Sequence, residues 1–451
     1  MKDIKHIHFL GIGGISQSAL AIILLHKGYK VSGSDKTESK ITKELKQKNI
    51  DVCINGISNQ IKIADLIVFS VAIHNDDKEM ILAKSLGKKI ISRAELLGLI
   101  ANEYKNVISI AGSHGKTTTT GMIAEIFIEA GFNPTVHIGG LLTKYNTNII
   151  LGNNDFFITE ACEYYDSFLE LKSDVSVVLN VQSDHMDYFK TINNLKKSFV
   201  KFVNNTKNSG LIVYNKSCNF FKQKIKKDAL SYSCGGGIVK SLNITEYKKG
   251  KYSFDCMFLG QKLGNIKLGV YGEHNVENAL SAICVALKYG VSFQTIKKAL
   301  FNYCGVKRRF EDYGIFNGVR VIHDYAHHPT EIKAIINLAK RIVKGDLYVV
   351  FQPHTFSRTL ALIDEFKKCF DGAKEVFVYK VYSAREDKSQ GIDENGLKDA
   401  LLLEGQMASS YNNYEEMKKN IVSTLKKGDL LLVLGAGDIE SFCEYFGKNN
   451  N

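Results

Sequence analysis

The sequence predicts an α/β protein built from three α/β units in series, and three observations support this prediction. The chain of 451 residues is long enough for about three domains of ordinary size. Short apolar segments that end in polar or glycine-containing turns alternate with amphipathic helical segments along most of the chain. The composition, with 45% hydrophobic and 24% charged residues, is that of a globular protein with buried cores. We place the units at residues 1–106, 107–305 and 306–451.

The first unit opens on a βαβ pattern. A predicted strand from His6 to Leu10 is followed by a glycine-containing turn, an amphipathic helix that ends at His26, and a second strand from Tyr29 to Ser32. Two parallel strands joined in this way need a crossover helix between them. A further strand is predicted from Leu66 to Ser70.

The turn after the first strand is similar to a dinucleotide-binding fingerprint. Gly11 and Gly13 follow that strand, and Asp35 follows the second strand, where an acid usually contacts a ribose hydroxyl. Ser16 occupies the place of the third glycine. The pattern therefore supports a diphosphate-bearing ligand more firmly than NAD, and a nicotinamide-dependent oxidoreductase is the weaker interpretation.

The second unit begins with the strongest motif in the chain. The strand from Val107 to Ala111 leads directly into Gly-Ser-His-Gly-Lys-Thr at residues 112–117, and a helix follows as far as Ala130. Such a turn points backbone N–H groups at a phosphate, while the lysine and the threonine hydroxyl suit outer phosphates and magnesium. Only two residues separate the glycines, whereas a standard phosphate loop has four. We predict phosphate binding here because the strand and the helix are both evident.

Two later strand ends add groups that bind cations. Glu160 follows the strand from Phe156 to Thr159, and Asp184 and His185 come shortly after the strand from Val175 to Leu179. The carboxyl ends of parallel strands share one edge of the sheet, where ligands bind. Carboxylates and an imidazole beside a triphosphate suit a divalent cation. Alternating polar and apolar residues with frequent glycines over 230–270 predict antiparallel hairpins on the flank of this sheet.

The third unit has polar loops in the same position. The segment from Asp324 to Glu331 lies between a strand that ends at His323 and a helix that begins at Pro329. A second polar segment, Gln352–Arg358, follows the next strand. We expect such strand-end loops to form a site rather than a core, and the guanidinium of Arg358 suits a carboxylate.

Several classes of protein are excluded by composition. The nine cysteines include no C-x-x-C pair, which argues against a zinc site or a disulfide framework. The formal net charge is +12, but the lysines are scattered and form no basic stripe with aromatic residues, so we expect no nucleic-acid partner. No apolar stretch is long enough to span a bilayer and no leader is evident, so we expect a cytoplasmic protein without a membrane partner.

Six motifs occur in the order that is typical of Mur ligases. They are Ala-Gly-Ser-His-Gly-Lys-Thr-Thr-Thr from Ala111, Asn-x-x-x-Asp-His-Met-Asp from Asn180, Gly-Glu-His-Asn-Val-Glu-Asn-Ala from Gly272, Arg-Arg-Phe-Glu from Arg308, Asp-Tyr-Ala-His-His-Pro-Thr-Glu from Asp324 and Gln-Pro-His-Thr-Phe-Ser-Arg from Gln352. The chain thus resembles this family from Gly11 to Gly437. The resemblance implies a three-domain Mur ligase architecture: a Rossmann-like N-terminal domain, a central P-loop ATPase-like α/β domain with an antiparallel flank, and a Rossmann-like C-terminal domain.

The resemblance also implies an activity. The Gly-Ile-Gly-Gly-Ile-Ser turn, the Ser-His-Gly-Lys loop and the His-His-Pro-Thr-Glu loop are most similar to the family members that add the first amino acid. This implies ATP-dependent ligation of L-alanine to the lactyl carboxylate of UDP-N-acetylmuramate through an acyl phosphate, giving UDP-N-acetylmuramoyl-L-alanine, ADP and phosphate in peptidoglycan precursor synthesis. The implied cofactors are ATP and Mg²⁺, the partners are small-molecule substrates, and the expected state is a monomer or weak dimer. The closest alternative is a sibling ligase that attaches a tripeptide to UDP-N-acetylmuramate in cell-wall recycling, and a non-catalytic nucleotide switch is a more distant one.

Roles for individual residues follow from the same resemblance. For the UDP-sugar it implies Gly11, Gly13, Gly14, Ser16, Asp35 and Ser70. For ATP it implies Gly112, Ser113, His114, Gly115, Lys116, Thr117, Thr118, Asn275, Asn278, Arg309 and Asp324. For the cation it implies Thr117, Glu160 and His185, and for L-alanine it implies Tyr325, His328 and Arg358. The implied catalytic residues are Lys116, Glu160, His185, His328 and Arg358.

The chain departs from the family pattern in the acidic motif of the second unit. Family members often have Glu-Ala-Asp-Glu-Ser, whereas this chain has Glu160-Ala-Cys162-Glu163-Tyr164. Glu160 keeps its implied role, and the roles of Cys162 and Glu163 stay open. Some relatives carry a carbamoylated lysine shortly after the Asp-His motif, and we assign that modification to no lysine here.

Overall fold

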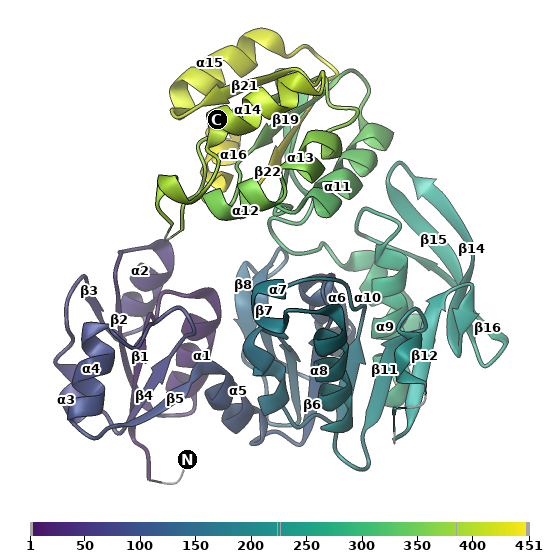
Figure 1. Ribbon diagram of the computed structural model, residues 1–451. Helices are drawn as coiled ribbons and strands as arrows, with labels where there is room; N and C mark the ends of the chain where they lie inside the picture. Colours follow the sequence, from purple (N-terminus) through teal and green to yellow (C-terminus); the bar gives the residue numbers. More distant parts are fainter. Residues whose placement is uncertain (1–2, 223, 226, 385, 448–451) are drawn as a thin grey trace. The chain divides into compact units, whose positions relative to one another are not determined.

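The computed structural model describes residues 3–222, 224–225, 227–384 and 386–447 (Figure 1). By its internal contacts the chain forms two compact units. The first comprises Met1–Thr245, Ser253–Val270 and His274–Cys304, and the second comprises Glu246–Tyr252, Tyr271–Glu273 and Gly305–Asn451. Apart from the tip of one hairpin, two β-sheets belong to the first unit, and a third sheet belongs to the second. The predicted α/β class is confirmed, whereas the residue boundaries of three separate domains stay a prediction.

The first sheet consists of parallel strands in the order β3-β2-β1-β4-β5. The strands are β1 (His6–Leu10), β2 (Lys30–Asp35), β3 (Asp51–Ile54), β4 (Leu66–Phe69) and β5 (Lys89–Ser92). The chain turns to the opposite side of β1 after β3, so the carboxyl end of β1 lies at the point where open α/β sheets bind ligands. The short strands β3 and β5 are not among the elements predicted from the sequence.

Helices cover both faces of this sheet (Figure 1). They are α1 (Ile15–His26), α2 (Lys40–Gln47), α3 (Gln60–Ile63), α4 (Lys78–Ser85) and α5 (Arg93–Ala101). Helices α1 and α5 pack on the face that carries Ile7 and Phe9. Helices α3 and α4 pack on the other face, which carries Leu10 and Ile67. This alternation follows from the period of two along a strand, because neighbouring side chains point to opposite faces.

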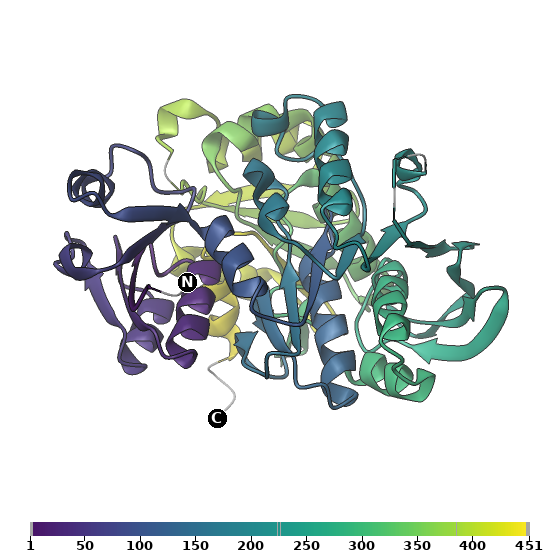
Figure 2. The same cartoon turned by 90° about the horizontal axis from the view of Figure 1, so that it is seen from below.

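In the described residues, the second sheet has eleven strands in the order β16-β15-β14-β12-β11-β10-β6-β9-β7-β8, with β13 paired to β12. They are β6 (Asn106–Ala111), β7 (Thr135–Leu142), β8 (Thr147–Ile150), β9 (Phe156–Glu160), β10 (Val175–Val178), β11 (Leu211–Asn215), β12 (Ala229–Cys234), β13 (Gly236–Gly237), β14 (Val239–Lys248), β15 (Lys251–Phe258) and β16 (Gln261–Lys267). The strands from β11 to β9 are parallel. Figure 2 shows the flank beyond them, where β15 and β16 are antiparallel as predicted.

The helical segments of this second part are α6 (Lys116–Glu129), η1 (Tyr164–Glu170), α7 (Met186–Phe189), α8 (Ile192–Asn204), η2 (Asn219–Phe221), α9 (Asn275–Lys288) and α10 (Phe293–Asn302). The short helix η1 packs against α5 of the first sheet. A Cβ atom on Gly98 would lie 2.5 Å from the carbonyl oxygen of Glu170. Because no side chain fits there, α5 approaches η1 at backbone distance, and this contact helps to join the first two sheets in one unit.

The third sheet has the order β17-β18-β22-β19-β20-β21, and only the β17–β18 pair is antiparallel among its described pairs. The strands are β17 (Glu311–Phe316), β18 (Val319–Asp324), β19 (Leu347–Phe351), β20 (Glu375–Tyr379), β21 (Ala408–Tyr411) and β22 (Leu430–Leu434). The helices are α11 (Pro329–Ile342), α12 (Phe356–Ala361), α13 (Ile363–Cys369), η3 (Lys388–Gln390), α14 (Glu394–Leu403), α15 (Tyr414–Thr424) and α16 (Glu440–Gly447). β22 lies between β18 and β19, so the carboxyl ends of these three strands are neighbours.

Two further observations concern the helices and the cysteines. In the part of the chain that the structure describes, no helix combines the length and the apolar character needed to cross a bilayer. All nine cysteines are free thiols.

A buried histidine on β18 generates a prediction about stability. The His323 side chain is 0% exposed, and neither ring nitrogen has a hydrogen-bond partner among the described residues. Burial, with help from the charge of Arg308, lowers the pKa of His323 to about 3. The folded chain therefore does not bind a proton that the unfolded chain takes up below about pH 6.5, so this residue costs stability as the pH falls from 6.5 towards 3.

We expect His323→Leu to remove that cost. We compare the free energy of unfolding of the variant with that of the wild type at each pH. The difference between them should be larger at pH 5.0 than at pH 7.5 by about 2 kcal/mol. Urea midpoints at the two pH values measure this difference. The exposed His26 supplies the control, since the difference in free energy of unfolding between His26→Leu and the wild type should not increase on acidification. A pH-independent effect of His323→Leu would contradict the prediction.

Candidate active site

Three neighbouring strands of the central sheet bring their carboxyl ends together. β6 pairs in parallel with β9 on one side and with β10 on the other. The glycine-rich loop at residues 112–115 follows β6, Glu160 ends β9, and the segment from Asn180 to His185 follows β10. The sequence predicted that these three segments share one edge of the sheet, and the structure places them there.

The glycine-rich loop has a fixed backbone conformation. Gly112 and Gly115 have φ of 147° and 85°, values at which a side chain is strained, and α6 begins directly after Gly115. The amide of Asn180 bonds both sides of His114, because its oxygen accepts from the His114 N–H at 2.9 Å and its nitrogen donates to the His114 carbonyl at 3.0 Å. The Ser113 hydroxyl exchanges hydrogen bonds with the backbone of Gln182. Asn180 and Gln182 therefore hold the loop, a role that sequence reasoning missed.

Helix α9 packs against the same loop. A Cβ atom on Gly115 would lie 2.7 Å from the Asn278 amide oxygen, and Asn278 in turn donates to the amide oxygen of Asn275 at 2.8 Å. Both asparagines are buried. The carbonyl of Thr118, in the first turn of α6, accepts from the buried Tyr303 hydroxyl at 3.1 Å. The predicted ATP residues of the first unit are thus brought together around the start of α6.

Lys116 forms a buried ion pair with Glu163. Its Nζ atom lies 3.0 Å and 3.1 Å from the two Glu163 carboxylate oxygens and 2.5 Å from the Gly112 carbonyl oxygen. The Glu163 side chain is 0% exposed. Burial alone would lower the pKa of Lys116, but the negative charge of Glu163 outweighs this effect and the pKa is raised. Lys116 is therefore a fixed positive charge at neutral pH.

Groups that can bind a cation form two sets around this pair, and the second set includes Glu163 itself. In one set, Glu160 accepts from the Thr117 hydroxyl at 3.2 Å and from the Gly139 N–H at 2.6 Å. In the other, ligand atoms of Glu163, Asp184 and His185 all lie within 4.8 Å of one another. The family resemblance groups His185 with Thr117 and Glu160, whereas the structure groups it with Glu163 and Asp184.

The donor atoms in these sets suit a hard divalent cation. Carboxylate and hydroxyl oxygens are the protein ligands that Mg²⁺ prefers, and it takes its remaining ligands from phosphate and water. The His185 imidazole is stacked on the Tyr164 ring, with 4.4 Å between centroids, which fixes its orientation. Thr117 and Glu160 fit magnesium well, and the Glu163 group is a second position of the same character.

The glycine turn after β1 is held by Asp35. The Gly13 N–H donates to the Asp35 carboxylate at 2.8 Å, and a Cβ on Gly13 would lie 2.8 Å from the same oxygen. The N–H groups of Gly11 and Ile12 both donate to the Ser34 carbonyl. Asp35 thus shapes the turn itself, and its predicted contact with the nucleotide stays a prediction.

Other predicted UDP-sugar residues lie around this turn. Gly14 is the residue before α1, which begins at Ile15. The Ser70 hydroxyl lies 3.9 Å from the position of a Cβ on Gly11. The Ser16 hydroxyl hydrogen-bonds to Nε2 of His137 on β7 at 2.9 Å.

In the second unit, Asp324 supports the loop that carries the predicted amino-acid residues. Its two carboxylate oxygens accept from the N–H groups of Phe310 and Ala326, each at 2.7 Å. Burial raises the pKa of Asp324 to about 6, although Arg309 and the two N–H groups act in the opposite direction. The Arg309 guanidinium lies 5.1 Å from the Tyr325 ring centroid. Arg309, Asp324 and Tyr325 are thus brought together.

The two adjacent histidines of this loop have different surroundings. The His328 ring caps α11 by accepting from the Thr330 N–H at 3.3 Å. The His327 ring lies 5.7 Å from the His354 ring. Burial lowers the pKa of both His327 and His354, that of His354 to about 4, and the charge of Arg358 lowers both further. The structure therefore brings His327 and His354, which sequence reasoning missed, close to Arg358.

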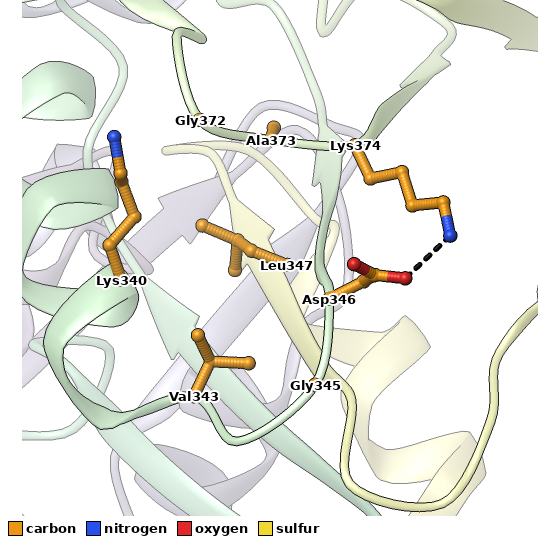
Figure 3. A pocket seen from close by; sticks show the side chains of 8 residues that line it. All are labelled: Lys340, Val343, Gly345, Asp346, Leu347, Gly372, Ala373 and Lys374. Atoms are coloured by element: carbon orange, nitrogen blue, oxygen red, sulfur yellow. Dashed lines mark hydrogen bonds and ion pairs between the residues drawn. The ribbon is translucent and has the colours of Figure 1, made fainter.

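A separate surface hollow lies in the third sheet at the end opposite to the loops that carry the predicted site residues (Figure 3). It is lined by Lys340, Asp346, Gly372 and Lys374, at the amino ends of β19 and β20. Lys374 forms an ion pair with Asp346 at 2.5 Å. None of the predicted site residues lines this hollow.

Three family models match the chain in succession. They are the Mur ligase family, catalytic domain at residues 6–105, the Mur ligase middle domain at residues 110–286, and the Mur ligase, glutamate ligase domain at residues 308–437. Over 447 residues the chain is 41% identical to the UDP-N-acetylmuramate–L-alanine ligase of Clostridium botulinum strain Okra, an alignment that covers 98% of this chain and 97% of that relative. The chain belongs to the Mur ligase family.

Other relatives agree with this membership. The UDP-N-acetylmuramate–L-alanine ligase of Clostridium perfringens strain 13 is 40% identical over 452 residues, which cover 99% of each chain. The crystal structure of UDP-N-acetylmuramate-alanine ligase MurC from Thermotoga maritima matches with a TM-score of 0.84 and 27% identity over 98% of each chain. The predicted family and the predicted Mur ligase architecture are confirmed.

The close contact between Gly115 and Asn278 generates a prediction about nucleotide binding. Gly115→Ala would force a strained backbone and press a methyl group against Asn278, displacing the loop, so we expect ATP affinity to fall by about tenfold or more. Gly131 has a similar φ of 78° but no atom within 4 Å of its Cβ position. Gly131→Ala should therefore cost about 1–2 kcal/mol of stability and leave ATP affinity unchanged. Calorimetric titration with ATP distinguishes the variants, and equal affinities would contradict the role of the contact.

Proposed function

We propose that the protein uses ATP to join L-alanine to the lactyl carboxylate of UDP-N-acetylmuramate, forming an amide in peptidoglycan precursor synthesis. The observation that carries this proposal is sequence identity of 40–41% over nearly the full length to relatives named for that reaction, together with a glycine-rich loop that leads into α6. We further propose magnesium as the cation, a cytoplasmic location, and a monomer or weak dimer.

The phosphates of ATP would bind at the start of α6. Backbone N–H groups of a helix N-terminus attract anions, and Lys116 adds a full positive charge at the first residue of the helix. Thr117 and Glu160 would hold one magnesium ion, and the Glu163, Asp184 and His185 group would hold a second. Magnesium in these positions would neutralise charge on the phosphates during phosphoryl transfer. Asn275, Asn278, Arg309 and Asp324 are assigned to ATP by family resemblance.

A carboxylate must be activated before an amine can displace oxygen from it. Phosphoryl transfer from ATP to the lactyl carboxylate gives an acyl phosphate and ADP, and the amine then displaces phosphate through a tetrahedral intermediate. The glycine turn at residues 11–16 would hold the diphosphate of the sugar nucleotide, with Asp35 shaping the turn and Ser70 beside it.

L-alanine would bind in the second unit. The Arg358 guanidinium suits its carboxylate, because such a fork forms two parallel hydrogen bonds. The amine must be neutral when it attacks, and the uncharged imidazoles of His327 and His354 are the groups that we propose as acceptors of its proton, although burial and the charge of Arg358 make both weaker bases than a free histidine. Family resemblance assigns Tyr325 and His328 to the same substrate, but because the His328 ring caps α11 we propose that Tyr325 contacts L-alanine and that His328 supports the helix.

The direct test is phosphate release from ATP with magnesium, in the presence and absence of each co-substrate. We expect release to require both UDP-N-acetylmuramate and L-alanine, and mass spectrometry to show a product that has gained one alanine residue. A tripeptide replaces L-alanine in a parallel reaction. Release with the tripeptide and not with L-alanine would contradict the proposal in favour of the recycling ligase.

Lys116 should be essential, but its removal has a structural side effect. Lys116→Ala leaves the buried Glu163 without a partner, which costs about 3–5 kcal/mol of stability. We therefore compare it with the double variant Lys116→Met/Glu163→Gln, in which no buried charge remains. Both should lose about a thousandfold or more in ligation rate, the scale found for single charges that stabilise phosphoryl transfer. The double variant also lacks one proposed magnesium ligand, so it serves as the control for stability and should recover the lost melting temperature. Near-wild-type activity of a stable variant would refute the role of Lys116.

His327 and His328 can be separated by the same substitution. Asparagine is a good helix cap, so His328→Asn should keep α11 and leave the KM for L-alanine within about threefold of the wild type. His327→Asn removes the imidazole beside His354 and Arg358 and should lower kcat/KM for L-alanine by about a hundredfold, as expected for loss of a proton acceptor. Steady-state kinetics with varied L-alanine measures both, and the reverse ranking would show that the capping histidine is the one that acts.

A further inference from the structure

Arg93 carries a charge that the described part of the protein leaves unbalanced. It is the first residue of α5, directly after β5, and its guanidinium donates one hydrogen bond, to the Ser16 hydroxyl at 3.3 Å. No carboxylate among the described residues forms an ion pair with it. Burial lowers the pKa of Arg93, because the charged guanidinium is less stable away from water. A partly buried guanidinium normally has an anionic partner.

The hydrogen bonds around Arg93 run in one direction only. The Thr159 hydroxyl donates to the Glu160 carbonyl at 3.1 Å, so it accepts from Nδ1–H of His137 at 2.9 Å. His137 is neutral, because burial and the charge of Arg93 lower its pKa to about 3, so its Nε2 carries no hydrogen and accepts from the Ser16 hydroxyl at 2.9 Å. The Ser16 oxygen in turn accepts from the Arg93 guanidinium.

This chain of hydrogen bonds has a consequence for ligand binding at the glycine turn. A phosphate or carboxylate oxygen needs donors, and the only hydrogen of the Ser16 hydroxyl is used by His137. The hydroxyl that family resemblance assigns to the diphosphate is therefore already committed. The remaining N–H donors of Arg93 are charged and lie beside that turn, because Arg93 contacts Ser16 in the first turn of α1 directly.

The position of Arg93 also relates it to the phosphate loop. The hydrogen bonds that run from Arg93 through Ser16, His137 and Thr159 end at the carbonyl of Glu160, the last residue of β9. Arg93 is thus linked both to the first turn of α1 and to the edge of the central sheet that carries the phosphate loop.

We propose that Arg93 binds an anionic group of the sugar-nucleotide substrate, either its diphosphate or its carboxylate, while Ser16, His137 and Thr159 orient the guanidinium. This inference rests on the proposed function for the identity of the substrate. Guanidinium groups bind such anions through charge-assisted, paired hydrogen bonds. Arg93 would then be a substrate-binding residue, and His137 a positioning residue that touches no substrate.

Titration calorimetry of Arg93→Gln and Arg93→Lys tests the proposal. Glutamine can still donate to Ser16 but has no charge, and lysine keeps the charge without the fork. With UDP-N-acetylmuramate we expect affinity to fall by about tenfold or more for Arg93→Gln, which equals about 1.4 kcal/mol, and by less for Arg93→Lys. ATP affinity should stay within about twofold, because the phosphate loop is unchanged. Arg341→Gln, at a half-exposed arginine of the second unit, is the matched control and should change nothing.

The choice of ligand identifies the anion. UDP and UDP-N-acetylglucosamine carry the diphosphate but no carboxylate, so equal losses with all three ligands would assign Arg93 to the diphosphate. A loss with UDP-N-acetylmuramate alone would assign it to the carboxylate. Unchanged affinity of Arg93→Gln for all three would overturn the proposal, even if the wild-type enzyme makes the expected product. Wild-type binding of UDP-sugars without ligation would instead refute the proposed function and leave the role of Arg93 testable.

Discussion

The buried ion pair between Lys116 and Glu163 is the interaction on which the site depends. A carboxylate with no solvent exposure stays ionised only beside a fixed positive charge, and Lys116 supplies it from the first residue of α6. The pair ties the segment after β9 to the loop after β6, while Asn180 ties the segment after β10 to the same loop. Three strand ends are thereby held at one place by contacts within the protein, and such preorganisation is what electrostatic catalysis requires.

Local patterns allowed the glycine-rich loop, Glu160 and the Asp184–His185 segment to be predicted. Strand, turn and helix signals at these positions lie within a few residues of one another, and one edge of a parallel sheet collects the loops that its strands lead into. The partners of these residues could not be predicted. That Glu163 faces Lys116, and that Asn180 holds His114, depend on the strand order β9-β6-β10, which local sequence does not specify.

His327 and His328 show another feature of the site that local sequence could not predict. The strand-to-helix junction of the third sheet was recognisable from Asp324 and Pro329, and so was its polar character. Which imidazole caps α11 and which lies beside His354 depends on backbone angles over two residues. Similarly, the fingerprint around Gly11 indicated a nucleotide contact for Asp35, but it could not show that one of the Asp35 oxygens also accepts from the Gly13 N–H. Composition and spacing define which groups are available, and packing decides how they are used.

The absence of a side chain at Gly98 sets how closely α5 approaches η1. Helix α5 begins with Arg93 and η1 begins directly after Glu163, so this contact joins two segments that carry charged residues of the proposed site. Gly98 meets the Glu170 carbonyl at that point with no room for a methyl group. Any larger residue would push α5 away from η1 without altering Arg93 or Glu163. A position that carries neither charge nor side chain therefore sets how closely the segments that carry these two residues approach each other.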